Sequence, residues 1–216
     1  MYAAVVFLPL IGAIIAGLFG RVIGDRAAQI VTCGAMLLAA VLGCFVFYDV
    51  AVLGNGREIV LFTWFDSGTF EASWALKFDS LTAVMVGVVT IVSSMVHVYS
   101  VGYMAHDHSI PRFMAYLSLF TFFMLMLVTA DNLVQMFFGW EGVGLASYLL
   151  IGFWFRKPSA SAAAIKAFVV NRVGDFGFAL GIMTVFWAFG TIEFAKLFPA
   201  DRSPVSEKDL PIQMFA

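Results

Sequence analysis

Long apolar runs alternate with short polar breaks along this chain of 216 residues. A hydrocarbon core about 30 Å thick takes around 20 helical residues to cross, and six of the runs are about that long. They lack the alternation of polar and apolar residues that marks the strands of a membrane barrel. The predicted spans are 2–20, 27–48, 80–104, 113–130, 132–155 and 162–189. The pattern therefore predicts an all-α integral membrane protein with about six transmembrane helices.

The basic residues of the short connections predict how these spans are oriented, because inner connections of membrane proteins carry an excess of Lys and Arg. With the N-terminus outside, the inner connections hold Arg21, Arg26, Arg112, Arg156 and Lys157. The outer connection before the third span then holds Arg57 and Lys77. Five basic residues against two favour an outside N-terminus. With an even number of spans, the segment after Phe189 is outside too.

The outer connection, residues 49–79, has a second pattern with a period of two. In "FEASWALKF" one side carries Phe70, Ala72, Trp74, Leu76 and Phe78, and the other carries Glu71, Ser73, Ala75 and Lys77. The segment follows "EIVLFTWF" and the turn sequence "DSG", so a β-hairpin on the outer face with a buried aromatic side is predicted. The alternative is an aromatic belt at the membrane interface without strands.

These patterns divide the chain into four parts. Residues 1–48 form two N-terminal transmembrane helices, and residues 49–79 form the hairpin connection. Residues 80–192 hold four further transmembrane helices. The last part, residues 193–216, has three of the six prolines and charges of alternating sign, so we expect a loop or a truncated tail.

Composition supports a membrane protein and removes other classes. Hydrophobic residues make up 62% of the chain and charged residues 12%, against roughly 45–50% apolar in soluble domains. A net charge of -2 without a dense basic cluster argues against a nucleic-acid partner and leaves the lipid bilayer as the expected surroundings. The N-terminus lacks a basic region before its apolar core and is predicted to be a retained span. Cys33 and Cys44 are about 16 Å apart on a helix and cannot form a disulfide with each other.

Four ionisable residues lie inside the last two predicted spans: Glu141, Lys166, Arg172 and Asp175. A charged side chain at the centre of a membrane helix costs about 2.5–3.5 kcal/mol on insertion scales, so these groups should face protein or water. The small residues around Glu141, among them Gly139, Gly142 and Gly144, favour close packing against a neighbouring helix.

The depths of these groups follow from helix geometry. If the two spans form an antiparallel hairpin about residues 156–161, Glu141 is level with residue 175 or 176, about 20 Å from the inner end. Arg172 precedes Asp175 by three residues and shares a helix face with it. Lys166 is close enough to the inner end for its side chain to reach the interface.

Two carboxylates and one guanidinium are therefore predicted to converge near the middle of the membrane. Arg172 can neutralise one acid but not both. Burial and the guanidinium act in opposite directions on the proton affinity of the other acid, which makes its proton occupancy sensitive to any nearby charge that moves. This predicts a proton-relay site. The alternative is a static Arg172–Asp175 ion pair with Glu141 permanently protonated and hydrogen-bonded to a neighbouring helix.

Four other features offer less chemistry. His97 is placed to pass protons near the inner surface, and a histidine satisfied by helix packing is an equal alternative. "HDH", residues 106–108, has no further Cys or His cluster to complete a metal site, so no metal-binding residues are predicted. Asp131 is expected to be a solvated turn residue beside Asn132. The glycine spacing of "GWEGVG" has no preceding strand and does not indicate a nucleotide site.

The longest specific motifs resemble a known family. "GWEGVGLASYLLIGF" and "KAFVVNRVGD", together with "VHVYSVGYM" and the hairpin connection, resemble the largest antiporter-like membrane subunit of respiratory complex I. This is the family of subunit L, or chain 5, of proton-translocating NADH:quinone oxidoreductase, and it is related to a large membrane component of multisubunit Na⁺/H⁺ antiporters. The resemblance covers residues 1 to about 199.

The resemblance implies an all-helical protein at the far end of the membrane arm that moves protons as quinone is reduced elsewhere. It implies no cofactor on this chain, with flavin, iron–sulfur clusters and quinone on partner subunits. Glu141 matches the essential glutamate of the fifth span, which acts on a neighbouring lysine. Arg172 and Asp175 match charges of the sixth span that have structural and coupling roles. The expected location is a bacterial inner membrane, with the mitochondrial inner membrane as the alternative.

The chain also departs from this family, because members continue through several more spans. One of those spans bears the lysine partner of Glu141, and Lys166 does not replace it because it differs by about 15 Å in depth. We therefore expect a fragment or a truncated gene that holds part of one proton pathway. The alternatives are a subunit of a multisubunit cation/proton antiporter and a membrane scaffold without transport of its own.

Overall fold

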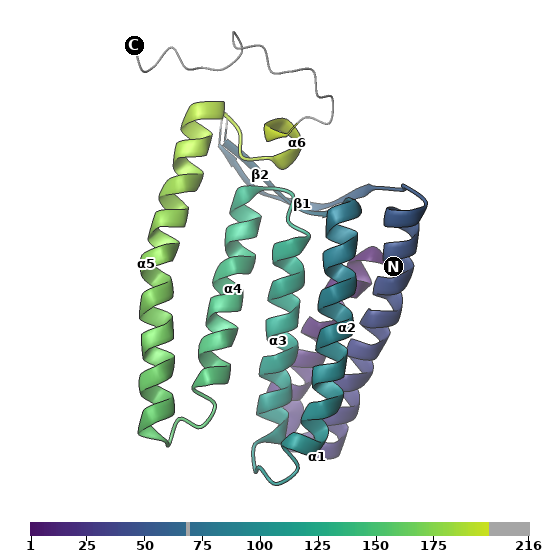
Figure 1. Cartoon of the computed structure of the whole chain (residues 1–216), viewed down its shortest axis with the longest axis vertical. Helices are drawn as coiled ribbons and strands as arrows, with labels where there is room; N and C mark the ends of the chain where they lie inside the picture. Colours follow the sequence, from purple (N-terminus) through teal and green to yellow (C-terminus); the bar gives the residue numbers. More distant parts are fainter. Residues whose placement is uncertain (68–69, 199–216) are drawn as a thin grey trace.

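The computed structural model describes residues 1–67 and 70–198. Its helices stand side by side as an antiparallel bundle, with a two-stranded sheet across one end (Figure 1). The elements are α1 (Tyr2–Phe47), the π-helical turn η1 (Tyr48–Val52), β1 (Arg57–Ser67), β2 (Phe70–Phe78), α2 (Ser80–Tyr103), α3 (Ile110–Val128), α4 (Leu133–Ile151), α5 (Pro158–Phe189) and α6 (Phe194–Leu197). We call the end that carries β1, β2 and α6 the hairpin end. The opposite end, with the connections 104–109 and 152–157, is the loop end.

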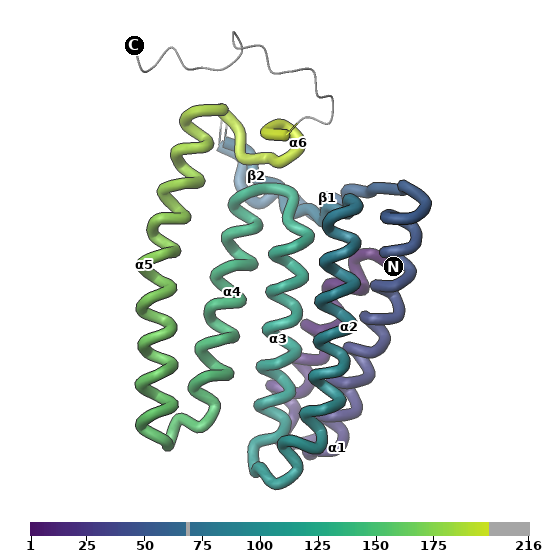
Figure 2. Tube along the Cα trace, viewed as in Figure 1, coloured from purple at the N-terminus to yellow at the C-terminus, as the bar shows by residue number. Residues whose placement is uncertain are grey.

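The first helix, α1, is a hairpin of two antiparallel arms, as Figure 2 shows. The chain reverses at Gly24, whose φ of 81° and ψ of 171° are not helical. A side chain rarely adopts such a φ, and glycine has no Cβ to oppose it. In the arms, a Cβ on Gly12 would lie 3.5 Å from Cβ of Ala35. The two arms and α2 to α5 make the six predicted passes, although residues 21–26 do not form the polar loop that the sequence suggested.

Helix ends follow local sequence signals. The side chains of Asp79 and Asn132 accept hydrogen bonds from the third residue after each, Thr82 N at 2.8 Å and Gln135 N at 2.9 Å, and so cap α2 and α4. α3 and α5 have proline in the first turn, and α5 ends at Gly190 with a φ of 69°. The predicted boundaries of these four spans agree with the structure to within about four residues.

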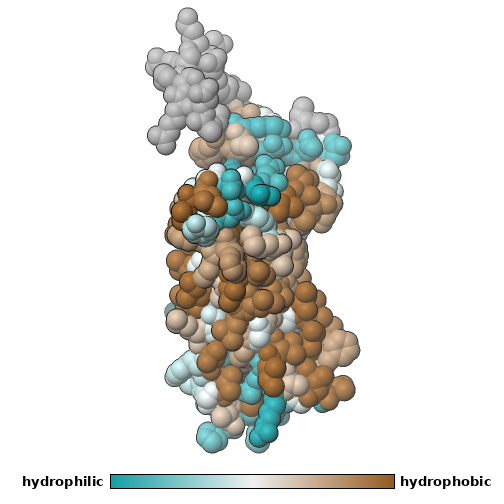
Figure 3. All heavy atoms as spheres, turned by 90° about the vertical axis from the view of Figure 1, so that its right-hand side faces the viewer, coloured by the Kyte–Doolittle hydropathy of each residue, from teal (hydrophilic) through white to brown (hydrophobic). Residues whose placement is uncertain are grey.

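Figure 3 shows an apolar belt between two more hydrophilic ends. Large apolar side chains are exposed on this belt, among them Leu18 at 74% and Val173 at 74%. Five helices in the described residues are long and apolar enough to cross a membrane, α1 with both of its arms counting as one. An outward-facing surface of this kind is stable in lipid and unfavourable in water, so the chain is a membrane protein. Cys33 and Cys44 are free.

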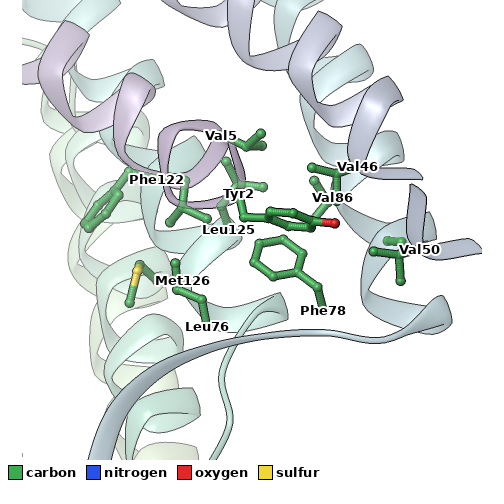
Figure 4. Packing of buried hydrophobic residues seen from close by; sticks show 12 residues of the cluster. Tyr2, Val5, Val46, Val50, Leu76, Phe78, Val86, Phe122, Leu125 and Met126 are labelled. Atoms are coloured by element: carbon green, nitrogen blue, oxygen red, sulfur yellow. The ribbon is translucent and has the colours of Figure 1, made fainter. Parts of the chain in front are cut away.

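The largest buried cluster lies at the hairpin end and joins both ends of α1 to β2, α2 and α3 (Figure 4). Tyr2 packs edge-on against Phe78 with ring centroids 4.9 Å apart, and Leu76 and Phe78 are almost completely buried. The hydroxyl of Tyr2 donates to the carboxylate of Asp49 just after the second arm. The cluster therefore holds both arms of α1 against the sheet.

The predicted β-hairpin is confirmed, and the alternative of an aromatic belt without strands is wrong. β1 and β2 pair antiparallel from Arg57↔Phe78 to Ser67↔Phe70, with two irregularities in β1. The aromatic side of β2 is buried at Leu76 and Phe78, as predicted. The last residue of the turn sequence "DSG", Gly68, lies outside the described residues.

The second edge of β2 is hydrogen-bonded to the connection between α3 and α4. The Gln135 amide accepts from Ala75 N at 3.1 Å and donates to Ala75 O at 2.7 Å, as a neighbouring strand would. Asn132 donates to Ser73 O at 2.7 Å, and Lys77 N donates to Thr129 O at 2.9 Å. Both edges of β2 therefore have partners, which satisfies backbone groups that burial would otherwise leave unpaired.

The expectation that Asp131 is a solvated turn residue is wrong. Its side chain is 4% exposed because β2 and the segment after α5 cover the connection, with Phe194 N donating to Asp131 O at 3.0 Å. Its Oδ1 atom is buried and accepts no hydrogen bond from the described residues. Burial raises the pKa of the Asp131 carboxyl, with Glu58 and Glu193 acting in the same direction and Lys77 against it.

The first residues of the predicted tail, 193–198, are folded against the bundle. Residues 194–197 form the single turn α6, and Asn132 pairs with Glu193 in an isolated bridge, so this part of residues 193–216 docks on the hairpin end. The rest of the predicted tail, residues 199–216, lies outside the described residues.

Helices α3 and α4 approach each other through glycines of α4. A Cβ on Gly139 would lie 2.6 Å from Leu127 N, closer than side chains pack. A Cβ on Gly142 would overlap the ring of Phe123. Backbones can come this close only where one residue lacks a side chain.

We predict that Gly139→Ala lowers the free energy of unfolding by about 1–3 kcal/mol, because the added methyl group forces α3 and α4 apart. The control is Gly144→Ala on the same helix, where the new Cβ would lie 3.9 Å from Asn171 Nδ2. That change should be neutral or stabilise by up to about 1 kcal/mol. Thermal midpoints in mild detergent check this, and equal effects of the two variants would show that the close approach is not needed.

We predict that Asp131→Asn stabilises the fold at pH 7 by about 1–3 kcal/mol, because it removes a buried carboxylate with an unpaired oxygen. A pKa raised by folding means that the native state binds the proton more tightly than the unfolded chain. The wild type therefore gains stability as pH falls from the native pKa towards the unfolded value, and the advantage of the variant shrinks. Thermal midpoints from pH 4.5 to 8 measure this, with the exposed Asp66→Asn as control. An advantage that stays constant with pH would contradict the assignment.

Candidate functional site

The structure brings Glu141, Arg172 and Asp175 together between α4 and α5. The Arg172 guanidinium forms an ion pair with the Glu141 carboxylate across the two helices. The same nitrogen, Nη1, is 3.5 Å from Asp175 Oδ2 one turn further along α5. The antiparallel arrangement of α4 and α5 places the three groups at similar depth, as the residue spacing predicted (Figure 1).

One contact of this cluster was missed from the sequence. Trp140 Nε1 donates to Asp175 Oδ1 at 2.8 Å, so the two oxygens of Asp175 face different groups, a tryptophan N–H and a guanidinium. Residue spacing could have predicted this contact, because the spacing that places Glu141 level with this part of α5 also places Trp140 level with Asp175. The Asp175 side chain is only 10% exposed, which makes both contacts strong.

Arg172 lies between two acids and an aromatic ring. Its guanidinium carbon is 4.6 Å from the ring centroid of Phe168. Its closer contact is with Glu141, so the alternative in which Arg172 pairs with Asp175 and leaves Glu141 to another helix does not describe this structure. If both acids are ionised, one guanidinium faces two negative charges, and a proton taken up by either acid would balance the cluster.

The cluster has an open side. The side chain of Arg172 is 42% exposed, and among the bundle helices of the described residues α5 packs mainly on α4. Charge at this depth is costly against lipid, so Arg172 requires a polar or protein neighbour on that side. Lys166 is also exposed, six residues earlier on α5 and therefore about 9 Å closer to the loop end.

His97 lies on α2, and α3 separates α2 from α4 (Figure 2). The structure does not bring it to Glu141. Its ring is fully buried, with Nδ1 2.8 Å from Ser93 O and Nε2 3.0 Å from Ser118 Oγ. An Nδ1 proton donated to the carbonyl leaves Nε2 to accept from the serine hydroxyl. This geometry is that of a histidine satisfied by packing between α2 and α3.

The loop with the sequence "HDH" serves a structural contact. Asp107 accepts from Ser109 N at 2.8 Å and from Trp154 Nε1 at 3.0 Å, which ties the connections 104–109 and 152–157 together. His106 and His108 are exposed. Within residues 1–67 and 70–198, no three His, Cys, Asp or Glu side chains are grouped to hold a metal ion.

Two family models match the chain. Residues 64–114 match one described as NADH-ubiquinone oxidoreductase (complex I), chain 5 N-terminus. Residues 130–215 match one described as NADH:quinone oxidoreductase/Mrp antiporter, TM. The first includes most of the hairpin and α2, and the second includes Glu141, Arg172 and Asp175.

Curated relatives agree with these matches. NADH-ubiquinone oxidoreductase chain 5 of Marchantia polymorpha is 54% identical over 198 residues, which are 92% of this chain and 30% of that protein. NADH-quinone oxidoreductase subunit L of Rhodobacter capsulatus is 54% identical over 205 residues, 92% of this chain and 28% of that protein. The chain therefore spans less than a third of the length of these relatives.

Solved structures share the fold. A chain of the membrane-bound sulfane sulfur reductase, an archaeal respiratory membrane complex, matches with a TM-score of 0.78 and 19% identity over 91% of this chain and 39% of that one. A chain of the Mrp complex from Dietzia sp. DQ12-45-1b matches with a TM-score of 0.72 and 21% identity over 89% of this chain and 20% of that one. With identities of about half over nine-tenths of its length and two matching family models, this chain belongs to the antiporter-like membrane subunits of complex I known as chain 5 or subunit L.

Proposed function

We propose that this chain contributes part of a proton pathway to the membrane arm of a proton-translocating NADH:quinone oxidoreductase. The observation that carries the proposal is the cluster of Glu141, Arg172 and Asp175, in which one guanidinium contacts two carboxylates inside the apolar belt. Intramembrane charges that face protein commonly mark proton relays. The family of the chain supports the same activity.

In this proposal Glu141 is the group that exchanges the proton, and Arg172 controls when it does so. While Arg172 is paired with Glu141, the glutamate is favoured as an anion. A shift of the guanidinium towards Asp175, 3.5 Å away, would leave Glu141 without its countercharge and favour proton uptake. The hydrogen bond from Trp140 holds Asp175 in place as the second acceptor.

The proposal includes partners and location. The open side of α5 at Arg172 is covered by protein. Lys166 and His97 have secondary roles in the pathway at most, given their positions. Flavin, iron–sulfur clusters and quinone are held by other subunits. The protein lies in a bacterial inner membrane with its hairpin end outside.

A second candidate is a subunit of a multisubunit cation/proton antiporter. Two observations favour the antiporter. The description of the second family model includes the Mrp antiporter, and the chain shares its fold with a chain of the Dietzia Mrp complex. A charge cluster able to exchange a proton serves either activity. The third candidate is a membrane scaffold without transport. In a scaffold, removing the charge of Glu141 would change only the thermal stability.

We predict that Glu141→Gln lowers NADH-driven proton uptake by inverted membrane vesicles by at least about half, because the amide keeps the volume but cannot exchange a proton. The control is Glu71→Gln, the same change on the exposed side of β2. Native gels should show unchanged assembly for both variants.

The outcomes separate the three candidates. A normal ratio of protons to electrons in Glu141→Gln would overturn the complex I pathway. Loss of a Na⁺-dependent pH gradient that needs no NADH would identify the antiporter. A variant with lower thermal stability and intact transport would identify the scaffold.

The orientation rests on charge. Basic residues gather at the loop end, which favours that end as the inner one. Arg21 and Arg26 flank the reversal at Gly24, and Arg112, Arg156 and Lys157 lie in or beside the two connections. We predict that in right-side-out vesicles a membrane-impermeant maleimide labels Thr63→Cys at the hairpin end and leaves Ser159→Cys unlabelled until the vesicles are opened. Both variants carry Cys33→Ser and Cys44→Ser. The reverse labelling would place the hairpin end inside.

A further inference from the structure

A hollow of about 390 Å³, lined mostly by polar residues, lies at the loop end. It lies between the connection from α2 to α3 and the connection from α4 to α5, both of which Figure 1 shows at that end. Asp107 and His108 line it from the first connection, and Trp154, Arg156 and Lys157 line it from the second. Arg112 in the first turn of α3 also lines it. Segments about 45 residues apart in the chain therefore form one site.

The hollow is positively charged. Arg112, Arg156 and Lys157 face a single carboxylate, Asp107. Both oxygens of Asp107 already accept hydrogen bonds, one from Ser109 N and the other from Trp154 Nε1. The ion pairs found in the described ranges involve Arg172 and Lys196, so none of these three cations is paired there. An anion bound here would meet three cations and one acid that is already hydrogen-bonded.

Aromatic rings and a carbonyl hold two of the cations in place. The Arg112 guanidinium carbon is 4.7 Å from the ring centroid of Phe153 and 5.2 Å from that of Phe155, and Nη2 donates to Phe153 O at 3.1 Å. Lys157 Nζ is 5.2 Å from the ring centroid of Trp154. Cations held in this way lose less conformational entropy when they bind a ligand. Tryptophan and cations at the ends of membrane helices are typical of the headgroup region.

A second hollow, of about 360 Å³, adjoins the first and runs beside α4 and α5. It shares Arg112, Phe153 and Phe155 with the first hollow and is otherwise lined mainly by apolar groups such as Leu149 and Ile165. Ile165 is two turns into α5, within the apolar belt. A charged hollow therefore opens beside an apolar groove that leads into the membrane. A free anion would use only the first, whereas a phospholipid would fill both.

We propose that the loop end binds an anionic phospholipid, with its phosphate between Arg112, Arg156 and Lys157 and an acyl chain along the groove at Leu149 and Ile165. Basic pockets between transmembrane helices bind such headgroups, and the cation–phosphate hydrogen bonds are charge-assisted. The site is separate from the Glu141 cluster and does not depend on the proposed function. A lipid bound there contacts α3, α4 and the start of α5 and holds them together at the loop end.

The test uses the complete membrane complex that carries this chain, purified in mild detergent and stripped of lipid. Native mass spectrometry follows a titration with dioleoylphosphatidylglycerol. We expect Arg156→Gln with Lys157→Gln to weaken binding about 10- to 30-fold, because each basic residue near a membrane surface contributes on the order of a fivefold change in affinity. Both residues are exposed, so the fold should persist, and a thermal midpoint verifies it.

The matched control is Arg21→Gln with Arg26→Gln, which removes two exposed cations from the same end but outside the hollow. Its affinity should stay within about twofold of the wild type. Equal weakening in both double variants would show general attraction to a basic surface and overturn the site. Unchanged affinity in Arg156→Gln with Lys157→Gln would also overturn it.

Two further titrations separate a lipid from other ligands. Inorganic phosphate or zwitterionic dioleoylphosphatidylcholine that binds as tightly as the anionic lipid would overturn the lipid assignment. Ile165→Ser should weaken binding of the dioleoyl lipid and leave that of dihexanoylphosphatidylglycerol unchanged, because only the long chain reaches the groove. Equal effects on both lipids would overturn the placement of the acyl chain.

Discussion

The close approach of α3 and α4 at Gly139 and Gly142 is the constraint on which the arrangement of the other helices depends. α3 is the centre of the bundle, with α1 and α2 on one side and α4 on the other. α5 packs mainly on α4, and Phe186 near its end also packs against Phe70 of β2, so its position depends in large part on where α4 lies. Because Glu141 lies between the two glycines on the helix, the packing that draws α4 onto α3 also determines which direction the carboxylate faces. It turns Glu141 away from α3 and towards Arg172 on α5.

The hairpin end shows how the protein satisfies polar backbone next to an apolar core. β2 would have one free edge in a two-stranded sheet, and the side chains of Asn132 and Gln135 with the carbonyl of Thr129 occupy it. The same contacts bury Asp131 and leave one of its oxygens without a partner. The packing of the α3–α4 connection on β2 therefore has two consequences. It supplies hydrogen-bond partners to the edge of β2, and it buries one oxygen of Asp131 without a partner. Burial raises the pKa of the Asp131 carboxyl, so the stability of the hairpin end depends on pH through this residue.

The two ends of the bundle have different chemistry, and the helices between them carry the charge cluster. Aromatic side chains and hydrogen-bonded backbone close the hairpin end, whereas cations and aromatic rings surround hollows at the loop end. The Glu141 cluster lies between, where α4 and α5 meet and where the described chain leaves α5 uncovered. Arg172 contacts two acids, with Glu141 the closer, and a guanidinium placed in this way responds to a change in the charge beside it.

The sequence by itself determined the membrane class, the six passes, the hairpin and the convergence of Glu141, Arg172 and Asp175. Each depends on a local property, namely hydrophobic length, a period of two, or residue spacing along helices of known rise. The family followed from long specific motifs such as "GWEGVGLASYLLIGF". Tertiary structure decided the rest. The sequence predicts a solvated turn residue at Asp131 because the segments that cover it, β2 and the segment after α5, are about 55 to 65 residues away. The preference of Arg172 for Glu141 over Asp175, the contact from Trp140 and the enclosure of His97 depend on how each helix is rotated about its axis. Packing against neighbours sets that rotation, and residue spacing alone does not contain it.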